Sequence, residues 1–345
     1  MSKIRIGLDI GATAVRAAEL SGSRDEGALS RAAQVALEPG AVAHGEIRDP
    51  AAVVAALKEL WRQGGFRSRQ VYLGVGNQRV LVREIVLPWL PTKELRESLR
   101  YQVQDFIPIP VDEAVLDFDV LEEFEHEGAQ MIRVLLVAAQ RSMVDTLLEV
   151  AREAKLEPQG LDLAPFALLR AVGEGDDPVF GNGGDEAIVD VGAEVTSLCV
   201  HDKGVPRFVR ILPTGGYDIT LAVARALDVP EADAELLKRG EEVAGADLED
   251  ARQVADGRAS TLIDEIRSSL EFYAAQTPGA HIARVVVTGG GSKLPGFCDL
   301  LQTRLGVLVE RGRLSRGADS SFDVDEEIEP HLAVAVGLAI PGGAR

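Results

Sequence analysis

Two segments of the chain place an aspartate two residues before a glycine, at the point where an apolar run ends. Residues 6–16 read Ile-Gly-Leu-Asp-Ile-Gly-Ala-Thr-Ala-Val-Arg, and residues 188–196 read Ile-Val-Asp-Val-Gly-Ala-Glu-Val-Thr. In both, small or polar residues follow the glycine and apolar alternation then resumes. This pattern predicts a β-hairpin with a tight turn that is open to a ligand. A carboxylate at such a turn suits a phosphate only when a cation lies between them, because the like charges otherwise repel.

The aspartates of these turns, Asp9 and Asp190, are therefore the residues that we expect to coordinate Mg²⁺ and to take part in any catalysis. Glycine lets the chain turn tightly and brings backbone N–H groups within reach of phosphate oxygens. Nearby hydroxyl and guanidinium groups would add hydrogen-bond donors and positive charge. The residues that fit these parts are Gly11, Gly192, Thr13, Thr196 and Arg16.

A third glycine-rich turn follows another apolar run in the second half of the chain. Residues 285–292 read Val-Val-Val-Thr-Gly-Gly-Gly-Ser. The bare backbone at Gly289, Gly290 and Gly291 would let a flat adenosine group approach closely. Asp-x-Gly is also a common turn sequence where no ligand binds. Its occurrence twice, together with the triple glycine, favours a nucleotide held between two related halves.

The composition excludes several classes of function. The chain has 345 residues, enough for two domains, and its net charge of −19 argues against nucleic acid as a partner. No apolar segment approaches the length that spans a bilayer, so we expect a cytoplasmic protein that is at most peripheral to a membrane. The two cysteines, Cys199 and Cys298, are predicted to be reduced core residues. The five histidines lack ligand spacing, which disfavours a metal site built by the protein alone.

The predicted elements repeat in two halves, each a hairpin sheet with helices and an insertion. In the first half, Asp49 is predicted to cap a helix that ends at Leu60. Strands are predicted at 71–76, 80–87, 114–121 and 131–138, with a polar turn at 122–130 and a helix with an apolar stripe at 92–106. A further helix is predicted from Ser142, with Asp145 as its capping partner.

Residues 161–172 are predicted to form a helix that connects the halves, followed by a loop at 173–184. In the second half we expect strands around Cys199, at 208–212 and at 282–287, and a mostly helical stretch at 218–278. The last helix, at 331–340, is apolar enough to be packed back on the core.

The three glycine turns, in this order, resemble the phosphate 1, phosphate 2 and adenosine loops of the actin-like ATPase superfamily. Within it, the chain is similar to the PilM family of type IV pilus assembly proteins. The segments that carry this likeness are 7–11 with 15–16, 101–108, 163–168, 215–220, 269–273 and 288–296. They keep their order over nearly the whole chain. The cell-division protein family FtsA is similar in architecture and in the position of the inserted unit.

This resemblance implies an α/β protein with the actin-like ATPase fold, in which two duplicated ribonuclease-H-like domains carry inserted subdomains. Subdomain 1A would comprise 1–87 with 161–185 and 329–345, the inserted subdomain 1C 88–160, subdomain 2A 186–225 with 281–328, and subdomain 2B 226–280. ATP with Mg²⁺ would lie in the cleft between the domains. Residues 11–13 and 192–194, which add Ala12, Ala193 and Glu194, would surround the phosphates.

Two further residues enter through the resemblance. Glu235 and Lys238 lie in an Ala-Glu-x-x-Lys sequence like the helix that grips the ribose and base, although their spacing equally fits an ordinary exposed helix pair. Arg16 stands where relatives usually carry lysine and keeps the charge. Ala164 stands where relatives often carry Glu or Gln near the attacking water, and alanine cannot orient water. We therefore expect nucleotide binding with at most slow ATP hydrolysis.

The resemblance also implies a partner, the short cytoplasmic N-terminal tail of a PilN-like inner-membrane protein. The tail would bind in a groove between 1A and 1C, placing the chain at the inner membrane through its partner. Trp89, Leu90 and the helix 92–106 could form one wall of this groove, although such an apolar stripe is more often core. Formation of a homo-oligomer stays open.

Two other functions stay open at this point. A small-molecule kinase of the same superfamily needs a catalytic aspartate near the γ-phosphate, and Asp162 is the available candidate, although its apolar neighbours favour a packing role. An FtsA-like cytoskeletal protein would form filaments. FtsA proteins typically end in an amphipathic membrane helix, whereas this sequence ends Ile-Pro-Gly-Gly-Ala-Arg.

Overall fold

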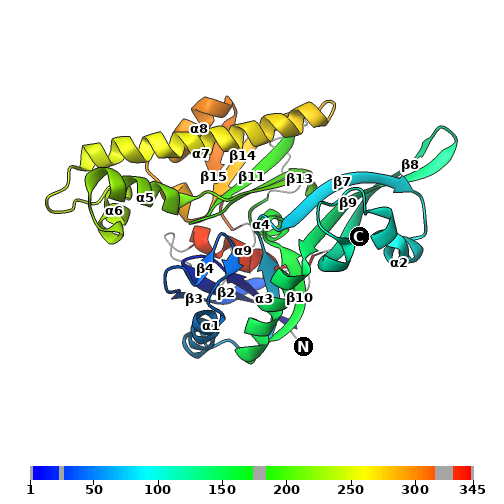
Figure 1. Cartoon of the computed structure of the whole chain (residues 1–345), viewed down its shortest axis with the longest axis horizontal. Coiled ribbons are helices and arrows are strands. Elements are labelled where there is room, and N and C mark those ends of the chain that lie inside the picture. Colours follow the sequence, from blue (N-terminus) through cyan, green and yellow to red (C-terminus); the bar gives the residue numbers. More distant parts are fainter. Residues whose placement is uncertain (1–2, 23–26, 174–183, 315–328, 343–345) are drawn as a thin grey trace.

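The first half of the chain is built on a five-stranded sheet (Figure 1). The computed structural model describes residues 3–22, 27–173, 184–314 and 329–342. The sheet has the order β3-β2-β1-β6-β10, in which β1 is antiparallel to β2 and parallel to β6. Its strands are β1 (Lys3–Ile10), β2 (Ala14–Gly22), β3 (Ala28–Ala36), β6 (Gln70–Val75) and β10 (Glu157–Leu163).

The second half repeats this sheet. Its order is β13-β12-β11-β14-β15, in which β11 is antiparallel to β12 and parallel to β14. Its strands are β11 (Asp185–Val191), β12 (Thr196–Asp202), β13 (Val205–Leu212), β14 (Ile282–Thr288) and β15 (Leu308–Arg311). Each predicted Asp-x-Gly hairpin is thus present, and each forms the centre of its sheet.

The first helix forms where its capping residues predict. In α1 (Pro50–Gly64) the Asp49 carboxylate accepts a hydrogen bond from the Ala52 N–H at 3.0 Å, and proline opens the first turn. The helix continues past the predicted end at Leu60 and stops at Gly65, whose φ of 60° suits glycine. It buries Leu57 and Leu60 in the core of the first half.

Residues 161–172 do not form one helix, which corrects the prediction. Residues up to Leu163 belong to β10, because they pair in parallel with β6, and α4 (Ala164–Val172) starts only afterwards with a proline in its first turn. The capping role predicted for Asp145 is also wrong. Helix α3 (Arg141–Glu153) follows β9 directly, and its N-cap residue, Gln140, makes no side-chain capping bond.

A separate three-stranded sheet, of order β7-β9-β8, lies between β6 and α3 in the chain. Its elements are β7 (Val80–Pro88), α2 (Thr92–Gln102), a short 3₁₀ turn (Val111–Glu113), β8 (Ala114–His126) and β9 (Ala129–Gln140). The predicted polar turn at 122–130 is wrong, because both strands run on to a tight turn at Glu127 and Gly128. The resulting hairpin projects from the body of the molecule (Figure 1).

The inserted unit thus differs in detail from its prediction. Helix α2 is shorter than predicted, since the chain turns at Val103 to bring both Val103 and Ile107 into the core beneath the small sheet. Because β7 pairs with β9, this sheet begins at Val80, ahead of the boundary predicted at residue 88. The division into four subdomains stays a prediction.

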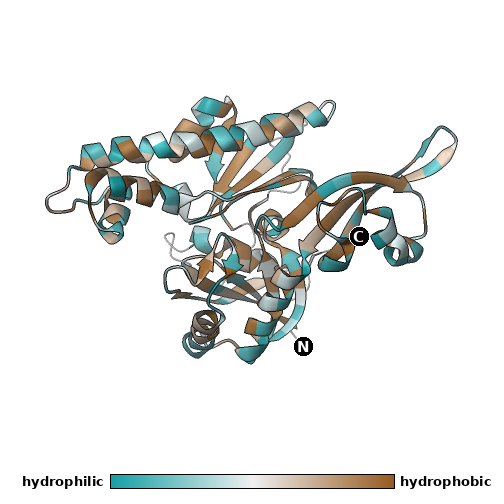
Figure 2. Cartoon of the chain, in the orientation of Figure 1, coloured by the Kyte–Doolittle hydropathy of each residue, from teal (hydrophilic) through white to brown (hydrophobic). Residues whose placement is uncertain are grey.

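The insertion of the second half is helical, as predicted. It comprises α5 (Gly216–Leu227), α6 (Glu231–Lys238) and α7 (Leu248–Gln276), and a 3₁₀ turn, η3 (Gly290–Lys293), and α8 (Phe297–Leu305) follow β14. Figure 2 shows the strands as largely apolar, whereas polar and apolar residues alternate along α7. Within the described ranges, we find no helix with the length and apolarity needed to cross a membrane.

Two helices form a large part of the contact between the halves. Helix α9 (Glu329–Ala339) packs on α4 and on the first sheet, as its apolar sequence predicts, and the two helices share one buried cluster with Ile188 and Cys199 of the second half. The helices cross so closely at Gly337 that a Cβ there would lie 1.8 Å from the Ala167 carbonyl oxygen. Cys199 is buried, as predicted, and Cys298 is half-buried; both are free thiols.

Candidate functional site

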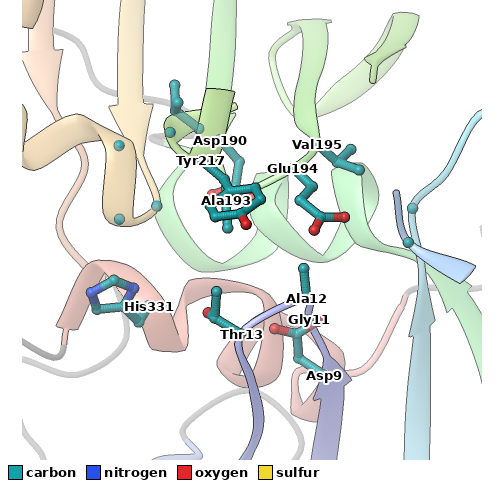
Figure 3. Close-up of a pocket in the computed structure, with 18 of the residues that line it drawn as sticks. Asp9, Gly11, Ala12, Thr13, Asp190, Ala193, Glu194, Val195, Tyr217 and His331 are labelled. Atoms are coloured by element: carbon teal, nitrogen blue, oxygen red, sulfur yellow. The ribbon is translucent and has the colours of Figure 1, made fainter. Parts of the chain in front are cut away.

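The two Asp-x-Gly turns have the same local geometry. In the first, the Gly11 N–H donates to the Ala14 carbonyl at 3.0 Å, and in the second the Gly192 N–H donates to the Val195 carbonyl at 3.0 Å. Both turns line one cavity of ≈ 1180 Å³ between the halves of the chain. Figure 3 shows the turns facing each other across this space, with Asp9 on one side and Asp190 on the other. This volume is ample for a nucleotide.

The two aspartates lie close enough to influence each other. Burial raises the pKa of Asp190 to about 7, with a further contribution from the charge of Asp9. Burial also raises the pKa of Asp9, but the guanidinium of Arg16 opposes that change. Two half-buried carboxylates with raised pKa values favour a cation between them, and Mg²⁺ commonly uses one or two carboxylates together with phosphate and water. Among the residues with described positions, no group of three or more metal-ligating side chains occurs.

Arg16 provides positive charge at the first turn. It faces Asp9 across the hairpin, and its Nη1 lies 3.8 Å from Asp9 Oδ2. Its side chain is 12% exposed, and its buried Nε has no hydrogen-bond partner among the described residues. A buried guanidinium N–H without a partner is costly, so an anion that accepts its hydrogen bond would stabilise the site.

The second turn is fixed from behind by the start of α5. The Gly216 N–H donates to the Gly192 carbonyl at 2.9 Å, and the Tyr217 N–H donates to the Ala193 carbonyl at 2.7 Å. Gly215 must be glycine, since a Cβ there would lie 2.5 Å from the carbonyl oxygens of both Gly192 and Ala193. These contacts orient the second turn before any ligand arrives.

Glu194 reaches across the cavity to the other half. Its Oε2 accepts a hydrogen bond from the His44 N–H at 2.6 Å. His44 lies in the turn of a small hairpin, β4 (Val42–Ala43) and β5 (Glu46–Ile47), which the buried Asn77 fixes to the first half through the Gly45 carbonyl. Glu194 thus connects the second turn to the opposite wall of the cavity.

One predicted donor lies elsewhere. Thr196 is fully buried and does not line the cavity, and its hydroxyl donates to the Thr214 carbonyl at 2.8 Å. That hydroxyl is therefore not available to a phosphate. The other predicted residues do line the cavity: Asp9, Gly11, Ala12, Thr13, Arg16, Asp190, Gly192, Ala193, Glu194, Glu235, Lys238, Gly289, Gly290 and Gly291.

The triple glycine is needed by the chain's own packing. Gly289 has a φ of 79°, and a Cβ there would lie 2.3 Å from Asp190 Oδ1. A Cβ at Gly291 would lie 2.2 Å from the Val191 side chain. These two glycines let the turn after β14 approach β11, and the same turn borders the cavity.

Glu235 and Lys238 are not an ordinary exposed pair. Lys238 Nζ donates to Glu235 Oε2 at 2.6 Å, to the Thr220 hydroxyl at 2.9 Å and to the Gly216 carbonyl at 3.1 Å. Burial alone would raise the pKa of Glu235, but the charge and hydrogen bond of Lys238 lower it. The pair is thus an anchored, charged wall of the cavity.

Several cavity residues were not predicted from the sequence. Tyr217 lines it, and its hydroxyl donates to Glu231 at 2.6 Å. His331 lines it from the first turn of α9, and burial together with nearby cations lowers its pKa to about 4. Ser142 and Thr146 of α3 also contribute. His331 is the polar exception in an apolar tail helix, which is the one signal that could have identified it.

Ala164 also borders the cavity, at the start of α4. Its methyl group lies 3.1 Å from the position of a Cβ at Gly76, so this corner has an apolar wall. Asp162, the candidate base of a kinase, does not line the cavity and forms an ion pair with Arg170. The geometry therefore does not support Asp162 as a base.

Of the residues around the expected partner groove, the apolar stripe of the helix is buried, whereas two aromatic side chains are exposed. Leu95, Leu99 and Val103 are buried, so the apolar stripe of α2 is core. Trp89, just before this helix, is 41% exposed, and Tyr101, in its last turn, is 72% exposed.

Comparison with known proteins places the chain in a family. The sequence profile of the family described as type IV pilus assembly protein PilM matches residues 7–342. Cell division protein FtsA of Streptococcus pneumoniae serotype 2 is 22% identical, with 88% of this chain and 74% of the relative covered. FtsA of Neisseria meningitidis serogroup B is 25% identical, with 67% of this chain and 62% of the relative covered.

Solved structures agree with this assignment. A PilM-PilN type IV pilus biogenesis complex matches with a TM-score of 0.81 and 33% identity over 97% of each chain. EutJ, an ethanolamine utilization protein of Carboxydothermus hydrogenoformans, matches with a TM-score of 0.57 and 17% identity over 99% of this chain and 90% of its own. MreB5 of Spiroplasma citri bound to ADP matches with a TM-score of 0.56 and 13% identity over 97% and 94%. The chain has the actin-like ATPase fold and belongs to the PilM family of type IV pilus assembly proteins.

Proposed function

We propose that this protein is an ATP-binding adaptor of the type IV pilus assembly machinery. In this proposal it binds the cytoplasmic N-terminal tail of a PilN-like inner-membrane protein and is held at the membrane through that partner. The observation that carries the proposal is the pair of matching turns on one cavity, with two half-buried aspartates and a guanidinium N–H that lacks a partner among the described residues. The similarity to a PilM-PilN complex supports the choice of partner.

The nucleotide would be held by groups from both halves. Arg16 and the backbone of the first turn would bind phosphate from one side, and the backbone of residues 192–194 from the other. Glu235 and Lys238 would border the nucleoside. Asp9 and Asp190 would hold Mg²⁺, which supplies the positive charge that two carboxylates and a phosphate chain require. The raised pKa of Asp190 fits this role, because a cation would stabilise its ionised form.

Binding to both walls would favour a closed arrangement of the halves. The Glu194–His44 hydrogen bond already joins the second turn to the first half. Val82 of β7 packs in the same buried cluster as Val209 of β13, so the inserted sheet is in contact with the second half. A change in the angle between the halves would therefore shift the three-stranded sheet relative to the second half. This sheet and α2 are where the partner tail is proposed to bind.

Hydrolysis is proposed to be slow at most. The corner where α4 begins carries the Ala164 methyl group, which can neither accept a proton nor orient water. Phosphate binding uses other residues and does not depend on this corner.

Calorimetry with the purified full chain tests the proposal. We expect ATP with Mg²⁺ to bind with one-to-one stoichiometry, and a synthetic peptide of a PilN-like N-terminal tail to bind independently of membranes. A peptide of the same composition in scrambled order is the control. The proposal is overturned if neither ATP nor the tail peptide binds.

A further inference from the structure

His331 is a polar side chain that lines the cavity just before the apolar residues of α9. It lies in the first turn of α9, whose residues from Leu332 to Ala339 are all buried. The imidazole lines the cavity on the same side as Thr13 of the first turn (Figure 3). Neither of the two Asp-x-Gly turns contains it.

The imidazole lies directly against the triple-glycine turn of the second half. A Cβ at Gly290 would lie 2.6 Å from His331 Cε1 and 3.2 Å from Nδ1. The His331 ring therefore leaves no room for a side chain at Gly290. At Gly289 and Gly291 the residues of β11 leave no room for one. The ring occupies the join between the phosphate-binding turn of one half and the triple-glycine turn of the other.

The charged groups around His331 come from three elements. The cations are Arg16 of β2, Lys293 of η3 and Arg239 just after α6. Glu329, on the same helix, is engaged by the Leu314 N–H at 2.8 Å. Burial and the three cations lower the pKa of His331 to about 4, so the imidazole is neutral at pH 7, with one nitrogen donating and the other accepting. A neutral donor among cations suits an anionic ligand that also carries hydroxyl groups.

We propose that His331 contacts the nucleotide at its ribose and α-phosphate, the part that ATP and ADP share. This rests on the proposed nucleotide binding. In the proposed pose the two aspartates would face the terminal phosphates, and the triple-glycine turn and Lys238 would border the nucleoside. His331 lies against the triple-glycine turn and near Arg16 of the first half, so it would contact the middle of the ligand.

Because His331 belongs to the first half, its contact with the nucleotide would also affect how the two halves are held together. Helix α9 is tied to the first half, because Arg5 and Arg170 donate to the carbonyls of Ala339 and Gly337 at 3.0 Å and 3.1 Å. Gly290 belongs to the second half. A ligand that touches both His331 and this glycine turn would therefore link the two halves at their junction.

The test is calorimetry of ATP and of ADP with wild type, His331→Ala, His331→Gln and His126→Ala. His126 is an exposed histidine on the projecting hairpin, so His126→Ala is a matched control. We expect His331→Ala to bind both nucleotides about tenfold more weakly, the effect of one lost hydrogen bond, and His331→Gln to recover most of that loss. The ratio of the wild-type affinity to the His331→Ala affinity should be the same in EDTA, because the contact between His331 and the nucleotide does not involve the metal ion.

The inference is overturned if His331→Ala binds ADP as tightly as wild type, or if its loss disappears in EDTA. Failure of wild type to bind either nucleotide would instead overturn the proposed function. If His331→Ala does not fold, as judged by its melting curve without ligand, His331→Gln and NMR of labelled histidine decide. We expect ADP to shift the Cε1 proton of His331 and to leave that of His126 in place; an unmoved His331 signal contradicts the inference.

Discussion

The two halves of this molecule share one sheet topology, yet their Asp-x-Gly turns differ in charge. Asp9 pairs across its hairpin with Arg16, whereas the equivalent partner of Asp190 is Ser197. The first aspartate therefore has a cation beside it, and the second has a pKa raised to about 7. The two turns thus share one backbone geometry, but only the first pairs its aspartate with a cation across the hairpin.

The turns also differ in how they are held. The second turn receives two backbone hydrogen bonds from the start of α5, and its Glu194 carboxylate reaches the opposite wall. The first turn is held by the Leu37 N–H, which donates to the Thr13 carbonyl at 2.9 Å. We interpret the first turn as the source of charge for the ligand and the second as the braced surface against which the halves close.

The largest expected effect concerns Asp190 in the absence of ligand and metal. Its pKa of about 7 in the folded chain lies well above the ordinary value of an aspartate, so the folded state is stabilised when this carboxyl is protonated. That contribution is complete below about pH 4 and is lost as the pH rises to about 7. Asp190→Asn should therefore gain stability over wild type at pH 8, by up to about 4 kcal/mol at ~1.4 kcal/mol per pKa unit.

Urea denaturation in EDTA at pH 5 and pH 8 measures this difference. The gain should be larger at pH 8 than at pH 5, and Asp9→Asn should gain less, because Arg16 already compensates the charge of Asp9. Equal gains for the two variants would contradict the asymmetry of the turns.

Replacing the residue that pairs with each aspartate should reveal the difference between the two turns in the affinity for ATP. Arg16→Ala removes a charge-assisted contact to phosphate and should weaken ATP binding by about 100-fold. Ser197→Ala at the equivalent position should change it by no more than about twofold, since a single weak contact is involved. Calorimetry at fixed ionic strength gives both values, and similar losses in the two variants would show that charge is not concentrated on the first turn.

A smaller effect is expected from the bracing carboxylate. Glu194→Gln keeps the shape of the side chain and weakens its hydrogen bond to the His44 N–H, so the halves should separate more readily. We expect ADP to dissociate about threefold faster, as measured by stopped-flow with a fluorescent analogue, which corresponds to part of one hydrogen bond. Glu123→Gln replaces an exposed carboxylate of β8 on the projecting hairpin, away from the cavity, so it is the matched control and should leave ADP dissociation unchanged. Unchanged dissociation in Glu194→Gln would argue against a bracing role.

The sequence predicted the duplicated hairpins because alternating apolar residues around Asp-x-Gly leave few other structures. It misplaced Thr196, since that residue was matched to Thr13 by its hydroxyl group. Counted from the aspartates, Thr13 corresponds to Glu194, and Thr196 corresponds to the fully buried Val15. Position relative to the turn decides which side chains face the ligand, and residue type alone does not.

Other features depend on contacts that no local pattern records. Residues 161–163 are a strand because β6 lies beside them, although their sequence continues smoothly into a helix. His331 enters the cavity because α9 returns to the first sheet from far along the chain. The spacing of Glu235 and Lys238 fits either a ligand-binding pair or an exposed helix pair, and only the packing of α6 on α5 turns them toward Thr220.

The central claim is that ATP sets the arrangement of the halves and thereby the affinity for the partner tail. The most direct test is the Kd of a PilN-like tail peptide for the full chain, measured with saturating ATP and Mg²⁺ and without nucleotide. We expect ATP to change this Kd by about fivefold or more, and the peptide to change the Kd of ATP by the same factor. Identical tail affinities in the two conditions, with ATP binding verified separately, would contradict it.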